Sequence, residues 1–519
     1  MSKEHPKNGG LAGALGLGEG SRDHVTILSG TVQNVVGLVV FAAATVVGIQ
    51  VLISRGFGAA GAAALAAVTL GTQLAWIASF GTRFGMDMAS VRRVAIDVGK
   101  GEPARARAVV RLALLIALVL SVAVGLVVFL LAPWLSGVFK DQAPPDVFRA
   151  AAVALPFIAA SQVILGGSRG LKIMRHTLVA YWVGQPVSWI VLTVIGWQIS
   201  KTTAMTVAAF AASWVFSAAL AELLWRRETH GFDPQLPAEP GEVRALIRYG
   251  GPRAPAALLS QALFWADYFV LSHYRHGPQV GVYSAAIRMA QALVLFLSAV
   301  SYMFSPFVAD LHERGERDRL NGLFKSVTRW TLAGTIPLLL LLLIAPAEVL
   351  QIFGTNFTTG TSWLRILLIG QIVNVSVGAA GFVLIMAGRT GWDLFVYALS
   401  FVLDLVLAIA LVPHLGPTGA AIAQTTTLAV SNALRLYLVW RFVHIQPYNR
   451  YYARLAIPAA IGAVAMLGVH AALGSAAWYA DLVGTGAVGA LAYYGAFLLL
   501  GLTPTEKGAL MRVLNRSRG

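Results

Sequence analysis

The chain of 519 residues contains no cysteine, and charged side chains make up only 12% of it. The absence of cysteine excludes structural disulfides and thiolate-bound metal sites. The low charge accompanies a hydrophobic content of 57%, which would leave a water-soluble fold too little polar surface to cover itself. The sequence therefore predicts a protein that lies largely within a lipid bilayer.

Several enzyme motifs are also missing. Gly99-Lys100-Gly101 lacks the Ser or Thr that completes a Walker A motif, and the chain has no Asp-x-Asp pair and no His-Glu-x-x-His sequence. The longest polar segment, from Arg226 to Ala245, leaves no room for a separate catalytic domain. We therefore expect no catalytic residue, no metal site and no cofactor. A membrane-embedded polymerase or ligase is disfavoured for the same reason.

What the chain does contain is a series of about fourteen apolar segments, each long enough to cross a hydrocarbon core of about 30 Å as a helix. They predict an all-α polytopic membrane protein with about 14 transmembrane helices. The polar stretch before them has no apolar run followed by a cleavage site, so the first helix is expected to be retained. Their approximate cores are residues 31–54, 59–82, 108–133, 147–168, 177–199, 203–225, 249–272, 279–306, 328–347, 360–387, 391–413, 417–440, 453–473 and 478–501.

The basic residues are distributed unevenly. Of 39 Lys and Arg residues, 29 fall in the two tails and in the gaps after even-numbered segments, five fall in the opposite gaps, and five lie within the segments. Because Lys and Arg in short loops stay cytoplasmic, both termini are predicted to be cytoplasmic. The net charge of +16 thus reflects topology. No nucleic-acid partner is expected, because that would require a soluble basic module.

An internal repeat relates the two halves. Arg55–Ala66 aligns with Arg275–Ala286 at a constant offset of 220 residues. Six predicted helices separate the two copies, so they must cross the membrane in the same direction. Parallel repeats of this kind are typical of transporters that bind substrate between the halves. Chance similarity among the small residues that pack membrane helices is the alternative interpretation.

Several motifs resemble those of a transporter family. The stretch Gly281–Arg288, preceded by Arg248–Pro252 and Asp267–Leu271, resembles the seventh and eighth helices of polysaccharide-type flippases. Together the motifs are similar to the polysaccharide transporter branch, with its Wzx-like oligosaccharide flippases, of the multidrug, oligosaccharidyl-lipid and polysaccharide exporter superfamily. Further matches are Ile352–Gly354, Leu364–Leu368 and Leu411–Ala423.

The resemblance implies two parallel six-helix bundles, plus two C-terminal helices, that alternate between inward- and outward-open states around a central cavity. The expected organisation is a cytoplasmic tail (1–24), an N-terminal bundle (25–228), a cytoplasmic linker (229–245), a C-terminal bundle (246–445), two additional helices (446–503) and a second cytoplasmic tail (504–519).

The resemblance also implies a function. A flippase of this branch would translocate a polyprenyl-(di)phosphate-linked oligosaccharide across the bacterial cytoplasmic (inner) membrane for surface polysaccharide biosynthesis, such as lipopolysaccharide or exopolysaccharide. Its partners would be the lipid-linked oligosaccharide, the lipid bilayer and a polymerase of the same pathway. A multidrug or cation antiporter and a peptidoglycan-precursor flippase remain alternatives, because they would share the fold and differ in the cavity.

Five arginines lie at membrane depth, where each costs at least ~2.5 to 3.5 kcal/mol on insertion scales. Arg83 and Arg435 near the cytoplasmic end, and Arg365 near the outer end, can reach an interface by snorkelling. Arg253 lies one turn into the seventh segment, and Arg288 lies deepest, about 13 Å below the start of the eighth. Because a guanidinium donates paired hydrogen bonds to phosphate, Arg253 and Arg288 are the stronger substrate-binding candidates.

Asp267 is the expected partner of Arg288. The two residues are about equally distant from the turn near Gly277-Pro278, so an antiparallel hairpin places them at one depth. They could form a buried ion pair that only neutralises both charges. Alternatively, Asp267 takes up a proton or cation and frees Arg288 for a diphosphate.

Other polar residues within the apolar segments complete the candidate set. Arg83 precedes Asp87 by four residues, a spacing that predicts either an interfacial ion pair or an arginine at the cytoplasmic mouth of the cavity. Gln33 and Asn34 either pack helices or contact substrate. Asp404, where relatives of the resembled family often carry Asn, is either protonated and inert or a ligand for a coupling ion.

Overall fold

The computed structural model describes residues 40–41, 43–100, 102–140, 142–171, 173–231, 240–474, 476–503 and 506. In this part of the chain nearly every residue is helical and no strand occurs, which confirms the predicted all-α class. Prolines begin several of the helices, where their missing N–H costs no hydrogen bond and their fixed φ favours the helix. Examples are Pro145, Pro278 and Pro417 at the starts of three long helices.

The first half contains the helices of the predicted N-terminal bundle. They are η1 (Ala43–Gly48), α3 (Ile49–Gly56), η2 (Gly58–Ala60), α4 (Gly61–Thr82), α5 (Met86–Gly99), α6 (Arg105–Leu130), α7 (Ala132–Val138), α8 (Pro145–Gly170), α9 (Arg175–Thr177), η3 (Leu178–Gly184), α10 (Gln185–Ile199) and α11 (Thr203–Glu228).

The second half begins inside the predicted linker, at Glu242. Its helices are α12 (Glu242–Leu263), α13 (Ala266–Tyr274), α14 (Pro278–Glu313), α15 (Arg317–Ile344), α16 (Pro346–Gln351), η4 (Thr355–Gly360), α17 (Thr361–Val377), α18 (Ala380–Met386), α19 (Thr390–Leu415) and α20 (Pro417–Val443). The chain continues through η5 (Arg450–Leu455), α21 (Ala456–Leu473), α22 (Trp478–Ala496) and η6 (Phe497–Gly501).

The described residues include 11 helices that are long and apolar enough to span a membrane, or 12 if α12 and α13, bent by 55°, form one span. The expected first span, 31–54, lies partly outside the described residues. In its described part, a shorter apolar helix runs over Ala43–Gly56. The expected span 417–440 does form the long helix α20. However, α20 is not among the 11, and it buries polar residues such as Gln424, Thr427 and Asn432.

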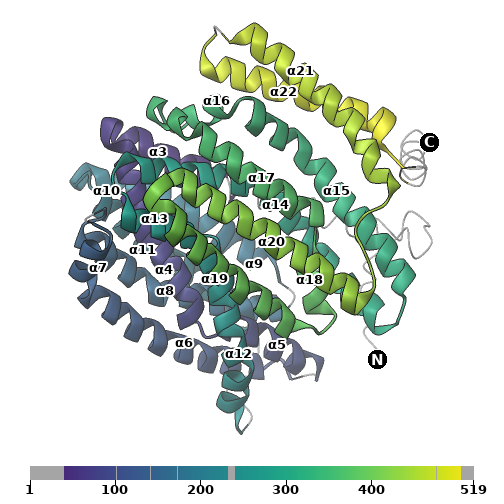
Figure 1. The fold of residues 1–519 in the computed structure, drawn as a ribbon. Coiled ribbons are helices and arrows are strands. Elements are labelled where there is room, and N and C mark those ends of the chain that lie inside the picture. The colour runs from purple at the N-terminus through teal and green to yellow at the C-terminus, as the bar shows by residue number, and fades with distance from the viewer. Residues whose placement is uncertain are drawn as a thin grey trace.

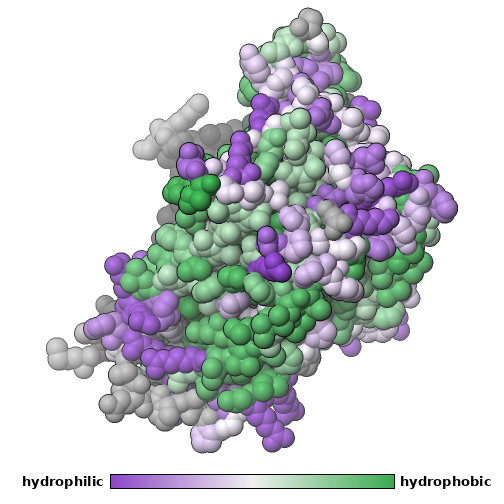
Figure 2. Space-filling view, turned by 90° about the vertical axis from the view of Figure 1, so that its left-hand side faces the viewer, coloured by the Kyte–Doolittle hydropathy of each residue, from purple (hydrophilic) through white to green (hydrophobic). Residues whose placement is uncertain are grey.

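The surface agrees with a bilayer environment. Large apolar side chains are exposed along α6, as at Leu115, Val119, Val122 and Leu126, and similar residues are exposed along α10, α19 and α22. An apolar surface of this extent is incompatible with water, so these faces contact lipid. Figure 2 shows broad hydrophobic areas on one face of the molecule, between hydrophilic patches. The protein is therefore a multi-pass membrane protein.

Helices of the two halves pack against each other, and the two C-terminal helices lie at one edge of the molecule. In Figure 1, α21 and α22 run side by side in yellow beyond α15, and both contact that helix. The central contact between the halves is made by α4 and α14. This arrangement matches the predicted pair of bundles with two additional helices.

The repeated glycines explain why these helices approach so closely. A Cβ atom added to Gly281 on α14 would lie 1.8 Å from the carbonyl oxygen of Ala62 on α4. At the equivalent position of the first half, a Cβ atom on Gly61 would lie 1.8 Å from the carbonyl oxygen of Ser54. Only glycine leaves room for backbone contact at this distance. Both glycines of the repeat thus allow close backbone contact, Gly61 within the first half and Gly281 between the halves.

Candidate functional site

A cavity of about 390 Å³ lies between the two halves. It is lined from the first half by α4, η3, α10 and α11, and from the second half by α12 and α14. This is the position that parallel repeats predict for a substrate site. The volume is near the lower end of the range for pockets that hold drug-sized ligands.

Three stacked aromatic rings form one wall of the cavity. Trp76 on α4 lies with its ring centroid 6.1 Å from that of Tyr181 on η3 and 5.8 Å from that of Trp214 on α11. The rings of Tyr181 and Trp214 are also 5.8 Å apart, and the three interplanar angles are 13°, 24° and 27°. Trp189 on α10 lines the cavity beside them. The wall is a nearly parallel aromatic surface made by three helical segments far apart in sequence.

Four glutamines supply most of the hydrogen-bonding groups. Gln73 and Gln185 line the cavity from the first half, and Gln261 and Gln291 line it from the second. The indole Nε1 of Trp76 donates to the Gln261 Oε1 at 3.4 Å, which links the two halves across the cavity. Each amide offers both donors and acceptors and carries no charge. Sequence reasoning missed this set, although glutamine within an apolar segment was an available signal.

Arg288 is the only charged side chain among the described residues that line the cavity. It projects from α14, and its guanidinium lies 5.0 Å from the ring centroid of Trp265, within the range of a cation–π interaction. Its buried Nε has no hydrogen-bond partner among the described residues. The deepest arginine of the sequence therefore faces the cavity with unused donor capacity.

The predicted ion pair between Asp267 and Arg288 is absent from the described structure. Asp267, which is fully buried, instead accepts a hydrogen bond from the hydroxyl of Tyr283 on α14. The prediction was wrong because equal distance from a turn fixes the depth of a residue but not the direction of its side chain. The chain also bends between α12 and α13, so Asp267 lies in the first turn of a separate helix, where the helix dipole favours a carboxylate.

A second buried acid lies near Asp267. Asp404 on α19 is fully buried and lies within electrostatic range of Asp267. The hydroxyl of Thr427 on α20 approaches Asp404, but neither carboxylate oxygen has a hydrogen bond of good geometry within the described part of the chain. The two acids are more than 130 residues apart in sequence, so their proximity could not be predicted from the sequence alone.

Arg83 forms the expected contact with Asp87 but does not snorkel. Its side chain is 3% exposed, with Nη1 3.3 Å from the Asp87 Oδ2, and Nε donates to the Ser79 carbonyl oxygen at 3.0 Å. The guanidinium also lies 4.0 Å from the ring centroid of Phe80. The snorkelling expectation was wrong because these partners hold the side chain inside the protein, where its buried Nη2 has no hydrogen-bond partner among the described residues. Arg83 is not among the described residues that line the cavity.

The remaining arginines differ from one another. Arg365 is exposed on α17, in agreement with snorkelling. Arg435 is only 12% exposed, and its guanidinium lies 4.6 Å from the ring centroid of Tyr397, so snorkelling does not describe it. Arg253 lies on α12, but its side chain is outside the described part of the structure. The predicted candidates Gln33 and Asn34 also lie outside the described residues.

Contacts between the halves close the molecule on the expected outer side. Arg55 lies in the last turn of the first-half helix α3. Its Nε donates to the Ile352 carbonyl oxygen at 2.8 Å, and its Nη2 donates to that of Gln351 at 3.0 Å. The repeat-equivalent Arg275 donates to the carbonyl oxygen of Pro413 at 2.9 Å, within the second half. Both arginines therefore cap main-chain carbonyls.

A further contact joins the halves on the expected cytoplasmic side. Arg93 on α5 donates from Nε to the Glu242 Oε1 at 2.6 Å, where α12 begins. The Cβ of an alanine at Gly250 would lie 2.2 Å from the carbonyl oxygen of Phe84, so the backbones also touch here. These contacts join the halves at both ends of the molecule, and the cavity lies between them.

Comparison with known proteins identifies the family. The MatE sequence profile matches residues 39–195 and 252–410, one block in each half and together more than half of the chain. The two blocks agree with the internal repeat. No curated protein shows a significant sequence match to the chain.

Solved structures share the fold. The lipid II flippase MurJ in an inward closed conformation superposes with a TM-score of 0.66 at 13% identity, covering 92% of this chain and 98% of its own. An inward-facing multidrug resistance MATE transporter of the MOP superfamily has a TM-score of 0.59 at 14% identity, with coverages of 76% and 98%. A MOP superfamily transporter from Pyrococcus furiosus has a TM-score of 0.58 at 15% identity, with coverages of 85% and 99%. With two profile matches and transporters of this fold as its structural neighbours, the chain is a membrane transporter that belongs to the MatE family.

Proposed function

We propose that this transporter is a flippase that moves a polyprenyl-(di)phosphate-linked oligosaccharide between the two leaflets of the cytoplasmic membrane by alternating access. The observation that carries the proposal is the chemistry of the cavity wall. It combines stacked aromatic rings, four glutamine amides and a single described cation, and no described lining residue is an acid.

The aromatic and amide groups suit a glycan. Sugar rings expose apolar C–H faces that pack on aromatic rings, and the stacked surface of Trp76, Tyr181 and Trp214 offers a large, rigid area for such packing. Sugar hydroxyls donate and accept hydrogen bonds, as glutamine amides do. An aromatic lining with a few polar groups is also the general pattern of sites that orient a neutral ligand.

Arg288 suits the phosphate. Its planar guanidinium donates paired, charge-assisted hydrogen bonds to phosphate oxygens. It makes a cation–π contact with Trp265, and its Nε has no hydrogen-bond partner among the described residues. An antiporter for cationic drugs would require acids in the same wall. The polarity of the described lining therefore favours an anionic cargo over a cationic one.

A peptidoglycan-precursor flippase is the second candidate. It is supported by the extent of the fold shared with the lipid II flippase MurJ, which covers 92% of this chain, although identity of 13% shows the fold alone. Such a cargo would also present sugars and a diphosphate. The two candidates differ only in the glycan that the aromatic wall recognises, and surface polysaccharide biosynthesis with a polymerase partner belongs to the first of them.

Asp267 and Asp404 are the proposed coupling residues. Two acids within electrostatic range, buried at membrane depth without a described basic partner, favour the uptake of a proton or a cation. Uptake would neutralise their mutual repulsion and change how α13, α14 and α19 pack. Tyr283 on α14 is hydrogen-bonded to Asp267, and α14 also carries Arg288. The altered helix packing would therefore change the position of Arg288 in the cavity.

The direct test is reconstitution of the purified chain in vesicles that contain a fluorescent undecaprenyl-diphosphate-linked oligosaccharide. Loss of protected fluorescence after a membrane-impermeant quencher is added reports transfer between leaflets. We expect transfer by the wild type and little transfer by Arg288→Ala. Lipid II and a cationic dye are assayed in parallel: preference for lipid II would support the second candidate, and transport of the dye alone would overturn both.

A further inference from the structure

We propose that Glu348, His470 and Asp481 form a binding site for a first-row divalent metal ion of the Zn²⁺ type, which joins the two C-terminal helices to the second bundle. The proposal does not depend on what the transporter carries. It rests on three metal-binding side chains from three different helices and on the charge that they leave uncompensated.

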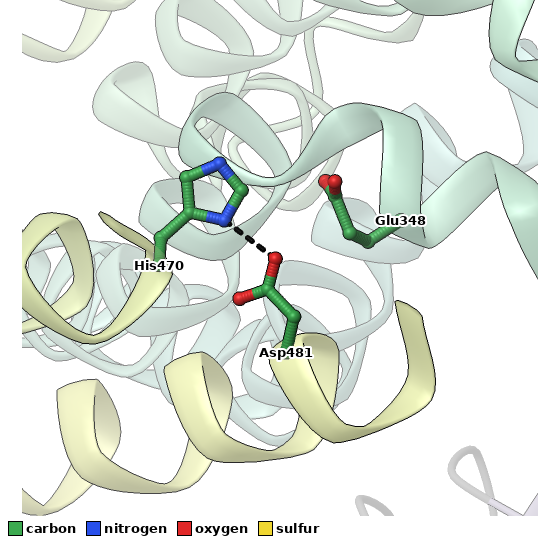
Figure 3. A group of neighbouring side chains, drawn as sticks. All are labelled: Glu348, His470 and Asp481. Atoms are coloured by element: carbon green, nitrogen blue, oxygen red, sulfur yellow. Dashed lines mark hydrogen bonds and ion pairs between the residues drawn. The ribbon is translucent and has the colours of Figure 1, made fainter. Parts of the chain in front are cut away.

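The three side chains meet where α16, α21 and α22 come together. One potential ligand atom from each residue lies within 4.8 Å of those of the other two. Figure 3 shows the carboxylates of Glu348 and Asp481 and the imidazole of His470 pointing toward one another. The His470 Nδ1 and the Asp481 Oδ2 are 2.8 Å apart. Residues separated by 122 positions or more in sequence, as Glu348 is from His470, could not be grouped before the fold was known.

A neighbouring hydroxyl holds one ligand in place. Asp481 is buried, and its Oδ1 accepts a hydrogen bond from the Thr485 Oγ1 at 2.9 Å, one helical turn along α22. The other oxygen is thereby directed at His470. Metal-binding carboxylates are commonly fixed by such outer hydrogen bonds, which set their orientation before the ion arrives.

The three side chains carry an excess of negative charge that a bound cation would balance. Glu348 on α16 is half-buried and has no ion-pair partner among the described residues, so His470 is the only described base against two carboxylates. Even with a protonated imidazole the group would carry a net negative charge. Arg55 contacts the end of the same helix, but its guanidinium binds the Gln351 and Ile352 carbonyl oxygens.

The donor set distinguishes among metals. One imidazole nitrogen with two carboxylate oxygens suits Zn²⁺, whereas Ca²⁺ and Mg²⁺ prefer oxygen ligands alone. Bond lengths of about 2.0 to 2.2 Å place the ligand atoms of a tetrahedral Zn²⁺ about 3.4 Å apart. Small side-chain rotations, which open the His470–Asp481 contact and close the gap to Glu348, reach that spacing. A water molecule would fill the fourth position.

The site would anchor a helix that takes part in closing the molecule. The last residue of α16 is Gln351, and its carbonyl oxygen accepts the hydrogen bond from Arg55 of the first half. A metal ion bound at Glu348 would hold this six-residue helix against α21 and α22. The two C-terminal helices would then support the expected outer contact between the halves.

The experiment measures Zn²⁺ bound to the purified full chain, prepared without a polyhistidine tag. After equilibration with Zn²⁺ and removal of the excess, elemental analysis is expected to find about one Zn²⁺ per chain. Calorimetric titration is expected to give at least about tenfold weaker binding for His470→Gln and for Glu348→Gln. His276→Gln and Asp146→Asn, which change exposed residues, serve as matched controls and should bind like the wild type.

Thermal unfolding provides a second measurement that does not require the variants to be fully stable. EDTA should lower the melting temperature of the wild type and leave that of His470→Gln unchanged. The proposal is overturned if the wild type retains no Zn²⁺, if Ca²⁺ binds as tightly, or if Glu348→Gln binds normally. It is also overturned if His470→Gln lowers the melting temperature equally with and without EDTA, because His470 and Asp481 would then act only as an ion pair.

Discussion

At position 68 the first half of the molecule has a buried valine, whereas the residue 220 positions later is Arg288, which faces the cavity. The same offset relates Val47 to Asp267. By contrast, the stacked rings of Trp76, Tyr181 and Trp214 all belong to the first half.

The two halves therefore share features that pack the helices but differ in the polar groups that they place at membrane depth. Gly61 and Gly281 both allow close backbone contact, and Arg55 and Arg275 both cap carbonyl groups. The described cavity charge and the two adjacent buried acids belong to the second half. We infer that the first half holds the neutral part of the cargo, and that the second half binds its charge and couples to an ion.

The largest effect is expected at Arg288. Arg288→Ala should lower lipid-linked oligosaccharide transfer by about 100-fold, because the loss of a paired hydrogen bond to a charged group amounts to about 1.5 to 3 kcal/mol per bond. Arg288→Lys should retain part of the activity. Arg365→Gln removes an exposed arginine at membrane depth and should transfer like the wild type; a comparable loss there would refute the special role of Arg288.

The coupling acids rank next. Asp404→Asn and Asp267→Asn should each reduce transfer by about tenfold and abolish its dependence on a proton or sodium gradient, because a neutral amide cannot take up the ion. The measurement is the initial rate in vesicles with and without an imposed gradient. Asp393→Asn changes an acid on the same helix that lies 3.9 Å from Arg435, and it should leave the gradient dependence intact.

The aromatic wall should have a smaller effect, restricted to the glycan. Tyr181→Leu removes one ring of the stack and should raise the substrate concentration needed for half-maximal transfer about fivefold, since aromatic contacts contribute about 0.5 to 1.5 kcal/mol. The same change should hardly affect a polyprenyl diphosphate without sugars. If this concentration rises equally for both substrates, the proposed division of roles between the halves is wrong.

The smallest effect is expected at Arg55, and it should differ from the effect at its repeat equivalent, Arg275. Arg55→Gln should increase labelling of a cysteine introduced at Ala62, a buried position in the same pocket as Arg55, about threefold. The reason is that hydrogen bonds of this kind contribute about 0.5 to 1.5 kcal/mol and these join the two halves. Arg275→Gln breaks a contact within one half and should lower the melting temperature without changing the labelling rate. The sequence has no cysteine, so the introduced thiol is the only one that the reagent can label.

The sequence predicted the fold well and the site partly. Apolar length and the repeat predicted the helices and the two halves, because membrane thickness and backbone packing constrain every segment. Depth also predicted Arg288 as the deepest arginine, and the structure places it at the cavity. The rotation of Asp267 away from Arg288 was not predictable, because it follows from the bend between α12 and α13.

Contacts between residues distant in the sequence were also not predictable. Asp404 near Asp267, the aromatic stack, and the meeting of Glu348 with His470 each depend on helix rotation and tilt, which hydropathy does not specify. The burial of Arg83 shows the same limit. Its distance from the helix end allowed snorkelling, but contacts with Ser79, Phe80 and Asp87 hold its side chain inside the protein.

The contact made by Arg55 has a consequence for genetics. Its guanidinium binds main-chain oxygens of Gln351 and Ile352, and every amino acid has such an oxygen. Side-chain substitutions at 351 and 352 can therefore leave this contact in place, while changes at Arg55 remove it. A mutational scan would find one sensitive position facing two tolerant ones, and a search for co-varying residue pairs would miss the contact entirely.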